Sequence, residues 1–119
     1  MRRNRTLELL RGGQPALGAW LQLGSAPAAR LLAAQGLCDW LLVDFEHAPV
    51  DPATAASILG CVADVSAGRV TPLARVADGT MASVKHALDA GAQGIVVPMV
   101  HGPDEVREAA RWARFPPEG

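Results

Sequence analysis

Residues 41–49 read Leu-Leu-Val-Asp-Phe-Glu-His-Ala-Pro, so an apolar run ends in two carboxylates and an imidazole just before a proline. Burying polar groups without partners costs free energy, and a strand that turns polar at its carboxyl end therefore predicts the mouth of a site. Side chains alternate along a strand, which places Leu42, Asp44 and Glu46 on one face and the intervening residues on the other. We expect the first face to carry chemistry and the second to pack against helices.

The remaining sequence alternates strand signals with helix signals. Ser25 and Asp51-Pro52 predict helix starts, and Gly36 and Gly91 predict helix ends. The expected strands cover 17–23, 40–46, 71–76 and 94–100, and the expected helices cover 25–35, 51–65, 81–90 and 103–113. Strands separated by helices in this way favour right-handed crossovers and a parallel sheet.

The predicted fold class is α/β, of the (β/α)8 TIM-barrel type, with about four βα units present. A complete barrel needs about 250 residues, whereas this sequence has 119. We therefore assign residues 1–16 to an amino-terminal arm and residues 17–119 to the amino-terminal half of a barrel domain. Such a half would expose two sheet edges, which promotes aggregation. The sequence thus predicts either a longer protein or pairing with another chain.

Composition excludes several classes of function. Hydrophobic residues make up 50% and charged residues 19% of the sequence, which excludes a disordered chain. The net charge of −1 and the lack of a basic stripe predict no nucleic acid partner. Cys38 and Cys61 match no metal-ligand spacing, and no stretch is long and apolar enough for a bilayer, so we expect a reduced, cytoplasmic protein without a membrane partner.

Arg75 ends the third expected strand, and the carboxyl ends of neighbouring parallel strands share one rim. Asp44, Glu46, His47 and Arg75 are therefore expected together, at the rim where barrel active sites are built. A guanidinium in this position suits a carboxylate or an enolate.

Each of these residues also has a structural interpretation. Asp44 could cap the following helix, His47 could be an exposed loop residue, and Arg75 could simply neutralise Asp44 or Asp78. For polar residues and cysteines outside the rim, a structural role is preferred to a functional one. These are a helix-start residue, two residues on a solvated helix face and two small apolar core residues: His101, Lys85, His86, Cys38 and Cys61.

The chemistry that remains is general-base catalysis with electrostatic stabilisation of an anion. Lys85 is the sole lysine and falls within an expected helix, so a Schiff-base mechanism has no obvious nucleophile at the rim. The sequence also lacks a dinucleotide-type glycine loop and a Gly-x-Ser-x-Gly elbow. His47 is the candidate base and Arg75 the candidate stabiliser.

Several motifs together resemble the HpcH/HpaI aldolase/citrate lyase family. They run in order from about residue 17 to residue 119: Gly18-Ala19-Trp20, residues 39–49, Arg75, Leu88-Asp89-Ala90-Gly91-Ala92, Val96-Val97-Pro98-Met99-Val100 and Arg114-Phe115-Pro116-Pro117-Glu118-Gly119. The resemblance implies a (β/α)8 barrel, usually a homo-oligomer, that acts as a metal-dependent class II aldolase on pyruvate or a related 2-oxo acid and an aldehyde.

The resemblance also implies individual roles. His47 resembles the family's catalytic histidine, Arg75 its enolate-stabilising arginine, and Asp89 an aspartate that pairs with the histidine. Asp44, Glu46 and Met99 are implied as supporting or substrate-binding residues. The divalent metal, Mg²⁺, Mn²⁺ or Co²⁺, is held in the family by acids on the fifth and sixth strands, so no metal ligand is expected within this sequence.

Two alternatives remain beside the aldolase. One is a non-catalytic, truncated half-barrel or assembly module, and the other is an acyl-ester lyase of the citrate lyase β kind. Because the resemblance places the metal ligands outside these residues, we expect the isolated chain to be inactive.

Overall fold

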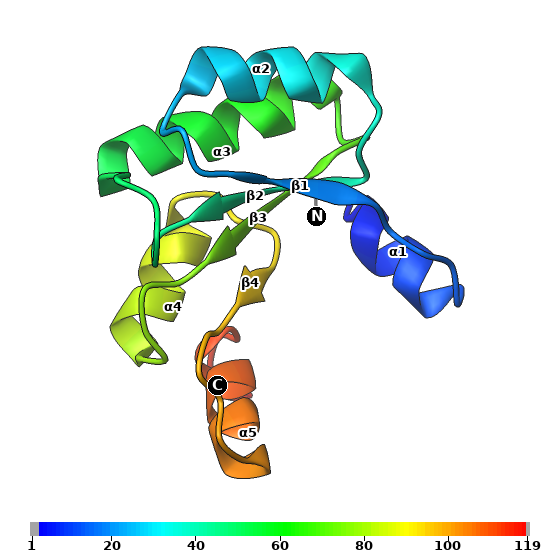
Figure 1. Ribbon diagram of the computed structural model, residues 1–119. Helices are drawn as coiled ribbons and strands as arrows, with labels where there is room; N and C mark the ends of the chain where they lie inside the picture. The colour runs from blue at the N-terminus through cyan, green and yellow to red at the C-terminus, as the bar shows by residue number, and fades with distance from the viewer. Residues whose placement is uncertain (1–2, 119) are drawn as a thin grey trace.

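In the computed structural model, which describes residues 3–118, helices and strands alternate along the chain (Figure 1). The elements are α1 (Arg5–Arg11), β1 (Gly18–Leu21), α2 (Ala26–Gln35), β2 (Trp40–Asp44), α3 (Pro52–Ser66), β3 (Thr71–Arg75), α4 (Met81–Asp89), β4 (Ile95–Val96) and α5 (Pro103–Trp112). None of the described helices is both long enough and apolar enough to cross a bilayer.

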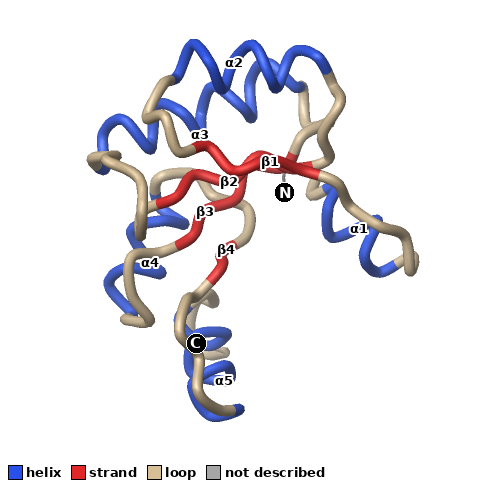
Figure 2. Tube along the Cα trace, in the orientation of Figure 1, coloured by secondary structure: helices blue, strands red, loops and turns tan. Residues whose placement is uncertain are grey.

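The strands form one parallel sheet in the order β1-β2-β3-β4. Figure 2 shows the strands side by side in a curved layer, with α2 and α3 covering one side of it. In register, Trp20 pairs with Leu42, Asp44 pairs with Arg75, and Arg75 pairs with Val96. Sequential parallel strands with helical crossovers confirm the predicted α/β fold and form part of a barrel.

The two faces of β2 differ as strand alternation predicted. Leu41 and Val43 are fully buried in the main core with residues of α2 and α3, such as Ala29, Ile58 and Leu59. Leu42 and Asp44 are also buried, but they lie outside that core, on the opposite, concave face of the sheet. Burying apolar side chains on the helix side stabilises the sheet and leaves the concave face for polar groups.

The predicted helix starts and ends are confirmed. Ser25 accepts a hydrogen bond from the Ala28 N–H, and Asp51 accepts from Ala53 and Thr54 N–H groups with Pro52 in the first turn. Gly36 adopts a left-handed conformation directly after α2 (φ 65°), where a side chain would be strained.

All four strands are shorter than predicted, and the reason is clearest for β2 and β4. β2 ends at Asp44 because its carboxylate accepts the Glu46 and His47 N–H groups and turns the chain there. β4 covers two residues instead of seven. Pro98 lacks an N–H donor and Met99 has a positive φ of 54°, and both features end extended pairing.

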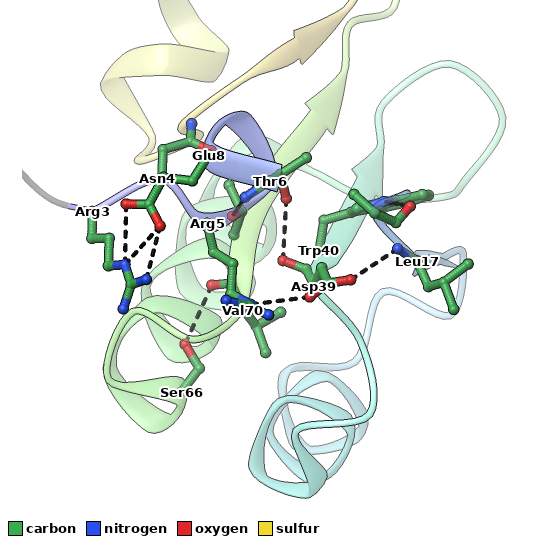
Figure 3. Close-up of polar contacts among 12 residues, drawn as sticks. Arg3, Asn4, Arg5, Thr6, Glu8, Leu17, Asp39, Trp40, Ser66 and Val70 are labelled. Atoms are coloured by element: carbon green, nitrogen blue, oxygen red, sulfur yellow. Dashed lines mark hydrogen bonds and ion pairs between the residues drawn. The ribbon is translucent and has the colours of Figure 1, made fainter. Parts of the chain in front are cut away.

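The amino-terminal segment contains α1, a helix that the sequence analysis missed. Figure 3 shows how this helix is attached to the amino ends of the strands. The Thr6 N–H donates to Thr71 Oγ1, the Thr6 hydroxyl donates to the Asp39 carbonyl, and Arg5 Nε donates to Asp39 Oδ1. The segment assigned as an arm is thus bonded to β3 and to the residue before β2.

Close contact between β1 and β2 explains one glycine. A Cβ atom at Gly18 would overlap the Trp40 side chain and its carbonyl oxygen. The Trp40 indole N–H donates to the Ala16 carbonyl at 3.1 Å, which ties the ring to the segment that enters β1. Position 18 therefore needs a residue without a side chain.

Candidate active site

The carboxylate of Asp44 lies at the carboxyl end of β2, is fully buried and accepts five hydrogen bonds. Oδ1 accepts from the backbone N–H groups of Glu46 and His47 and from Arg75 Nε at 2.9 Å. Oδ2 accepts from Arg75 Nη2 at 2.6 Å and from Gln22 Nε2 at 3.2 Å. Five donors around a buried carboxylate satisfy the charge that burial would otherwise penalise.

Arg75 ends β3 and is held on two sides. Its Nε and Nη2 form a two-pronged ion pair with Asp44, and its Cζ lies 4.5 Å from the centroid of the Trp20 ring. An ion pair along one edge and an aromatic ring against the face fix the plane of a guanidinium. The alternative that Arg75 neutralises Asp44 is confirmed as a contact, whereas Asp78 accepts hydrogen bonds from Thr80 and Ser83.

This arrangement changes the acidity of both partners. The Arg75 side chain, with smaller contributions from Gln22 and two backbone N–H groups, holds the pKa of Asp44 far below its ordinary value, although burial acts in the opposite direction. The bond to Asp44 likewise raises the pKa of Arg75. Asp44 is therefore an anion at neutral pH, and it serves as a fixed acceptor.

Glu46 and His47 follow Asp44 in the turn after β2. Glu46 Oε2 lies 3.1 Å from Arg75 Nε, but the Nε hydrogen points to Asp44 and this buried oxygen has no hydrogen-bond donor among the described residues. The His47 side chain is 63% exposed, with Nε2 at 3.6 Å from Glu46 Oε1. The turn thus presents an accessible imidazole beside a carboxylate with unused acceptor capacity.

The predicted group of four rim residues is brought together, but two other predicted residues are not. Met99 follows β4, is 76% exposed and lines a separate hollow of about 380 Å³ next to α5. Asp89 is the last residue of α4, which begins after the carboxyl end of β3 and runs back to the amino end of the sheet, where Gln93 bonds to Pro72. Within one chain, Asp89 therefore lies at the opposite end of the strands from His47.

Sequence reasoning missed Trp20 and Gln22. Both are in or just after β1 and alternate with Leu21, which belongs to the helix-side core. The signal was available: Gly18, Trp20 and Gln22 share a face by strand alternation, and parallel pairing of the first two strands brings that face beside Asp44. These two residues did not stand out in the sequence because the apolar residues Leu21 and Leu23 flank Gln22, so the segment reads as one apolar strand.

The described residues do not form a complete metal site. No group of three or more His, Cys, Asp or Glu residues among positions 3–118 could hold a metal ion. Both oxygens of Asp44 are occupied by protein donors, which leaves the unpartnered Glu46 Oε2 as one candidate ligand. Mg²⁺ requires near-octahedral oxygen coordination, so these residues alone do not fit a divalent metal.

Comparison with known proteins gives a consistent family assignment. The sequence profile of the HpcH/HpaI aldolase/citrate lyase family matches residues 16–119. The 4-hydroxy-2-oxo-heptane-1,7-dioate aldolase of Escherichia coli is 42% identical over 110 residues, which cover 92% of this chain and 40% of that protein. The hydroxypyruvate/pyruvate aldolase of Sagittula stellata is 41% identical over 117 residues, covering 98% of this chain and 45% of that protein.

A solved structure shows the same arrangement of elements. The crystal structure of an HpcH/HpaI aldolase/citrate lyase family protein from Burkholderia cenocepacia J2315 superposes with a TM-score of 0.87 at 40% identity, and the match covers 98% of this chain and 46% of that one. The chain thus spans less than half the length of the relatives it matches.

Proposed function

The chain belongs to the HpcH/HpaI aldolase/citrate lyase family, and from that premise we propose that it is the amino-terminal part of a class II aldolase. The reaction makes or breaks a carbon–carbon bond between pyruvate, or a related 2-oxo acid, and an aldehyde. The observation that carries this proposal is the pairing of a buried Asp44 with Arg75 beside an exposed His47, at the carboxyl rim of parallel strands.

Arg75 is the proposed stabiliser of the enolate. A guanidinium has five N–H donors, and Asp44 takes one from Nε and one from Nη2. The donors on Nη1 are not engaged by any described residue and are available to an oxyanion. Because Asp44 and Trp20 already hold the guanidinium, binding an anion requires little reorganisation, which is the basis of electrostatic stabilisation in enzymes.

His47 is the proposed base. Imidazole is the side chain used most often for proton transfer in active sites, and this one is exposed to the mouth of the sheet with a carboxylate 3.6 Å away. Deprotonation next to a carbonyl leaves an enolate, and the Arg75 donors lie on the same rim to receive its charge. Asp44 and Glu46 support these groups, Asp44 through Arg75 and Glu46 through its contacts with both Arg75 and His47.

The other residues implied by the family resemblance have different places in the proposal. Asp89 is proposed to pair with the histidine of a second copy of the chain, because its own His47 lies at the far end of the strands; the proposal therefore includes a homo-oligomer. Met99 is assigned to the wall of the substrate entrance. The boundary between residues 1–16 and the barrel segment 17–119 stays part of the proposal, and the family match over residues 16–119 supports it.

We propose that the divalent metal of the family, Mg²⁺, Mn²⁺ or Co²⁺, is bound through ligands beyond these residues. When bound, such an ion polarises the 2-oxo acid and stabilises negative charge. Since the described residues lack a complete ligand set, the isolated chain is proposed to release no pyruvate from an aldol substrate even with Mn²⁺ added. The unpaired outer edges of β1 and β4 support the same view that further strands complete the site.

A chimeric enzyme tests the function. Residues 1–119 are joined to the remaining part of the Sagittula stellata aldolase, and pyruvate release from a 4-hydroxy-2-oxo acid is measured with Mn²⁺. Retro-aldol activity that depends on His47 and Arg75 supports the proposal. A chimera that folds and binds Mn²⁺ but shows no such activity contradicts the proposed function. Pyruvate release by the isolated chain contradicts only the proposal that the isolated chain is inactive.

A further inference from the structure

We propose that Trp20 and Gln22, both from the first strand segment, are positioning residues that together fix the guanidinium of Arg75. Their importance for turnover rests on the proposed function, whereas their action on Arg75 does not. Neither residue belongs to the group predicted from the sequence, and both contact that group directly.

The Arg75 side chain extends across a whole strand to reach Trp20. β2 lies between β1 and β3, and neighbouring strands are about 4.8 Å apart. Arg75 is level with Asp44, and Trp20 is level with Leu42, yet the Arg75 Cζ is 4.5 Å from the Trp20 ring centroid. The guanidinium therefore lies over the concave face of β2 and ends against the indole.

The burial of Leu42 agrees with this path. Leu42 points away from the helix-side core, toward the face that no described helix covers, and is nevertheless only 1% exposed. Trp20 and Leu73 flank Leu42 on the neighbouring strands, and the aliphatic part of a long arginine side chain readily covers apolar surface of this kind. The concave face is thus closed over Leu42 although no described helix covers it.

Gln22 acts on Arg75 through Asp44. Its Nε2 and the Arg75 Nη2 both donate to the same oxygen, Asp44 Oδ2, at 3.2 and 2.6 Å. The second oxygen is held by Arg75 Nε and two backbone N–H groups. Without Gln22, Oδ2 would keep an acceptor site open to water. The glutamine therefore completes the set of donors around Asp44 and keeps the carboxylate in the position that binds Arg75.

The two contacts constrain different motions. Asp44 holds one edge of the guanidinium, and its central carbon lies over the Trp20 ring. Rotation about the ion pair is limited by the ring, and sliding across the ring is limited by the ion pair. The unengaged donors on Nη1 therefore point in one direction before any substrate arrives, and such preorganisation reduces the entropy lost when an anion binds.

The test measures Arg75 directly in the full chain by ¹⁵N NMR of its Nε–Hε group. We expect Trp20→Leu to shift the Hε resonance and to speed guanidinium rotation about threefold, the size expected for an exposed cation–π contact. Gln22→Met, which keeps length but removes the amide donor, should also speed that rotation. Trp20→Phe retains an aromatic face and should restore most of the slow rotation.

Matched controls separate positioning from a general loss of stability. Trp112→Leu and Gln35→Met change the same residue types away from the rim and should leave the Arg75 signal unchanged. Urea unfolding of each variant establishes that it is folded. An unaltered Arg75 rotation in either Trp20→Leu or Gln22→Met overturns the proposal.

The consequence for turnover is tested separately in the chimera. There, Trp20→Leu should raise KM for the 2-oxo acid several-fold, and Trp20→Phe should restore it. An inactive chimera with the expected NMR changes would count against the aldolase function and for the positioning role. An active chimera with an unaltered Arg75 signal would count for the aldolase function and against the positioning role.

Discussion

β2 carries an aspartate–arginine pair at each end, and the two pairs differ in kind. Asp39, just before the strand, binds Arg5 through a single 3.1 Å contact, and the two side chains are 23% and 39% exposed. Asp44, at the other end, is fully buried and binds Arg75 through two contacts. The first pair attaches a helix to the sheet (Figure 3), and the second holds a cation at an open rim.

Under the proposed function, the same two residue types serve structure at one end of a strand and chemistry at the other. At the amino end, Asp39 is surrounded by contacts that close the sheet: Arg5, the Leu17 N–H and, through its carbonyl, Thr6. At the carboxyl end, the Nη1 donors of Arg75 are not engaged by any described residue, and His47 is exposed nearby. The position of the ion pair in the sheet, and not the ion pair itself, distinguishes the candidate site from a structural contact.

The largest expected effect separates the chemistry of the carboxyl rim from its stability. In the chimera, His47→Ala should lower turnover by about 10²- to 10⁴-fold, the usual contribution of a general base. Because the imidazole is exposed and makes only a 3.6 Å contact, the free energy of unfolding should change by less than about 0.5 kcal/mol. Steady-state kinetics and urea unfolding measure the two quantities, and unchanged turnover would remove His47 as the base.

The next effect compares the two aspartates directly. Asp44→Ala removes both hydrogen bonds of the largely buried Arg75 to a carboxylate and leaves only the Glu46 contact, so it should lower the free energy of unfolding by about 3 kcal/mol. Asp39→Ala removes bonds to Arg5 and the Leu17 N–H and should cost about 1 kcal/mol. Urea titrations of both variants provide the comparison. Equal losses would show that the rims do not differ in the way proposed.

Acid should weaken the carboxyl-rim pair in a defined direction. The folded-state pKa of Asp44 is depressed, mainly by Arg75, so its stabilisation is present above the ordinary aspartate pKa of about 3.9 and is lost as pH falls toward the folded-state value. Relative to Asp44→Asn, which does not titrate there, the wild-type chain should lose up to about 1.4 kcal/mol per pH unit below about pH 4. A constant difference between pH 6 and pH 2.5 would contradict this.

The smallest expected effect concerns the amino-rim pair. Arg5→Ala removes a partly exposed ion pair and should lower the free energy of unfolding by less than about 1 kcal/mol, with the difference shrinking further in 1 M salt. The same salt should leave the effect of Asp44→Ala almost unchanged, because that carboxylate is buried. A salt-sensitive effect of Asp44→Ala would mean that its rim is wetter than the geometry indicates.

Most of the fold was predictable because its signals are local. Alternation along the second strand, the cap at Asp51-Pro52 and the glycine after α2 each act within a few residues; the strand was confirmed over residues 40–44, and the helix start and end were confirmed. The helix that was missed depended on contacts between distant segments. α1 is short and is held by Thr71 and Asp39, which are 65 and 33 residues from Thr6. Propensity alone gives little signal for such a helix.

The site was predictable in part for the same reason. Asp44, Glu46 and His47 are adjacent in sequence, and Arg75 follows from parallel pairing. Gln22 needed the register of β1 against β2, which sets what lies beside Asp44. Asp89 shows the reverse problem: a family motif marks the residue, but only the direction of α4 reveals that it lies at the other end of the strands.

The contact between Gly18 and Trp40 allows tryptophan fluorescence to report on the structure of this chain. The indole of Trp40 is fixed against the β1 backbone, Trp20 lies under Arg75, and Trp112 is in α5. Three variants that each keep only one of these tryptophans would report separately on the contact between β1 and β2, on the carboxyl rim and on α5. Adding a single methyl group at position 18 would force the Trp40 indole out of place, and its emission would record the change.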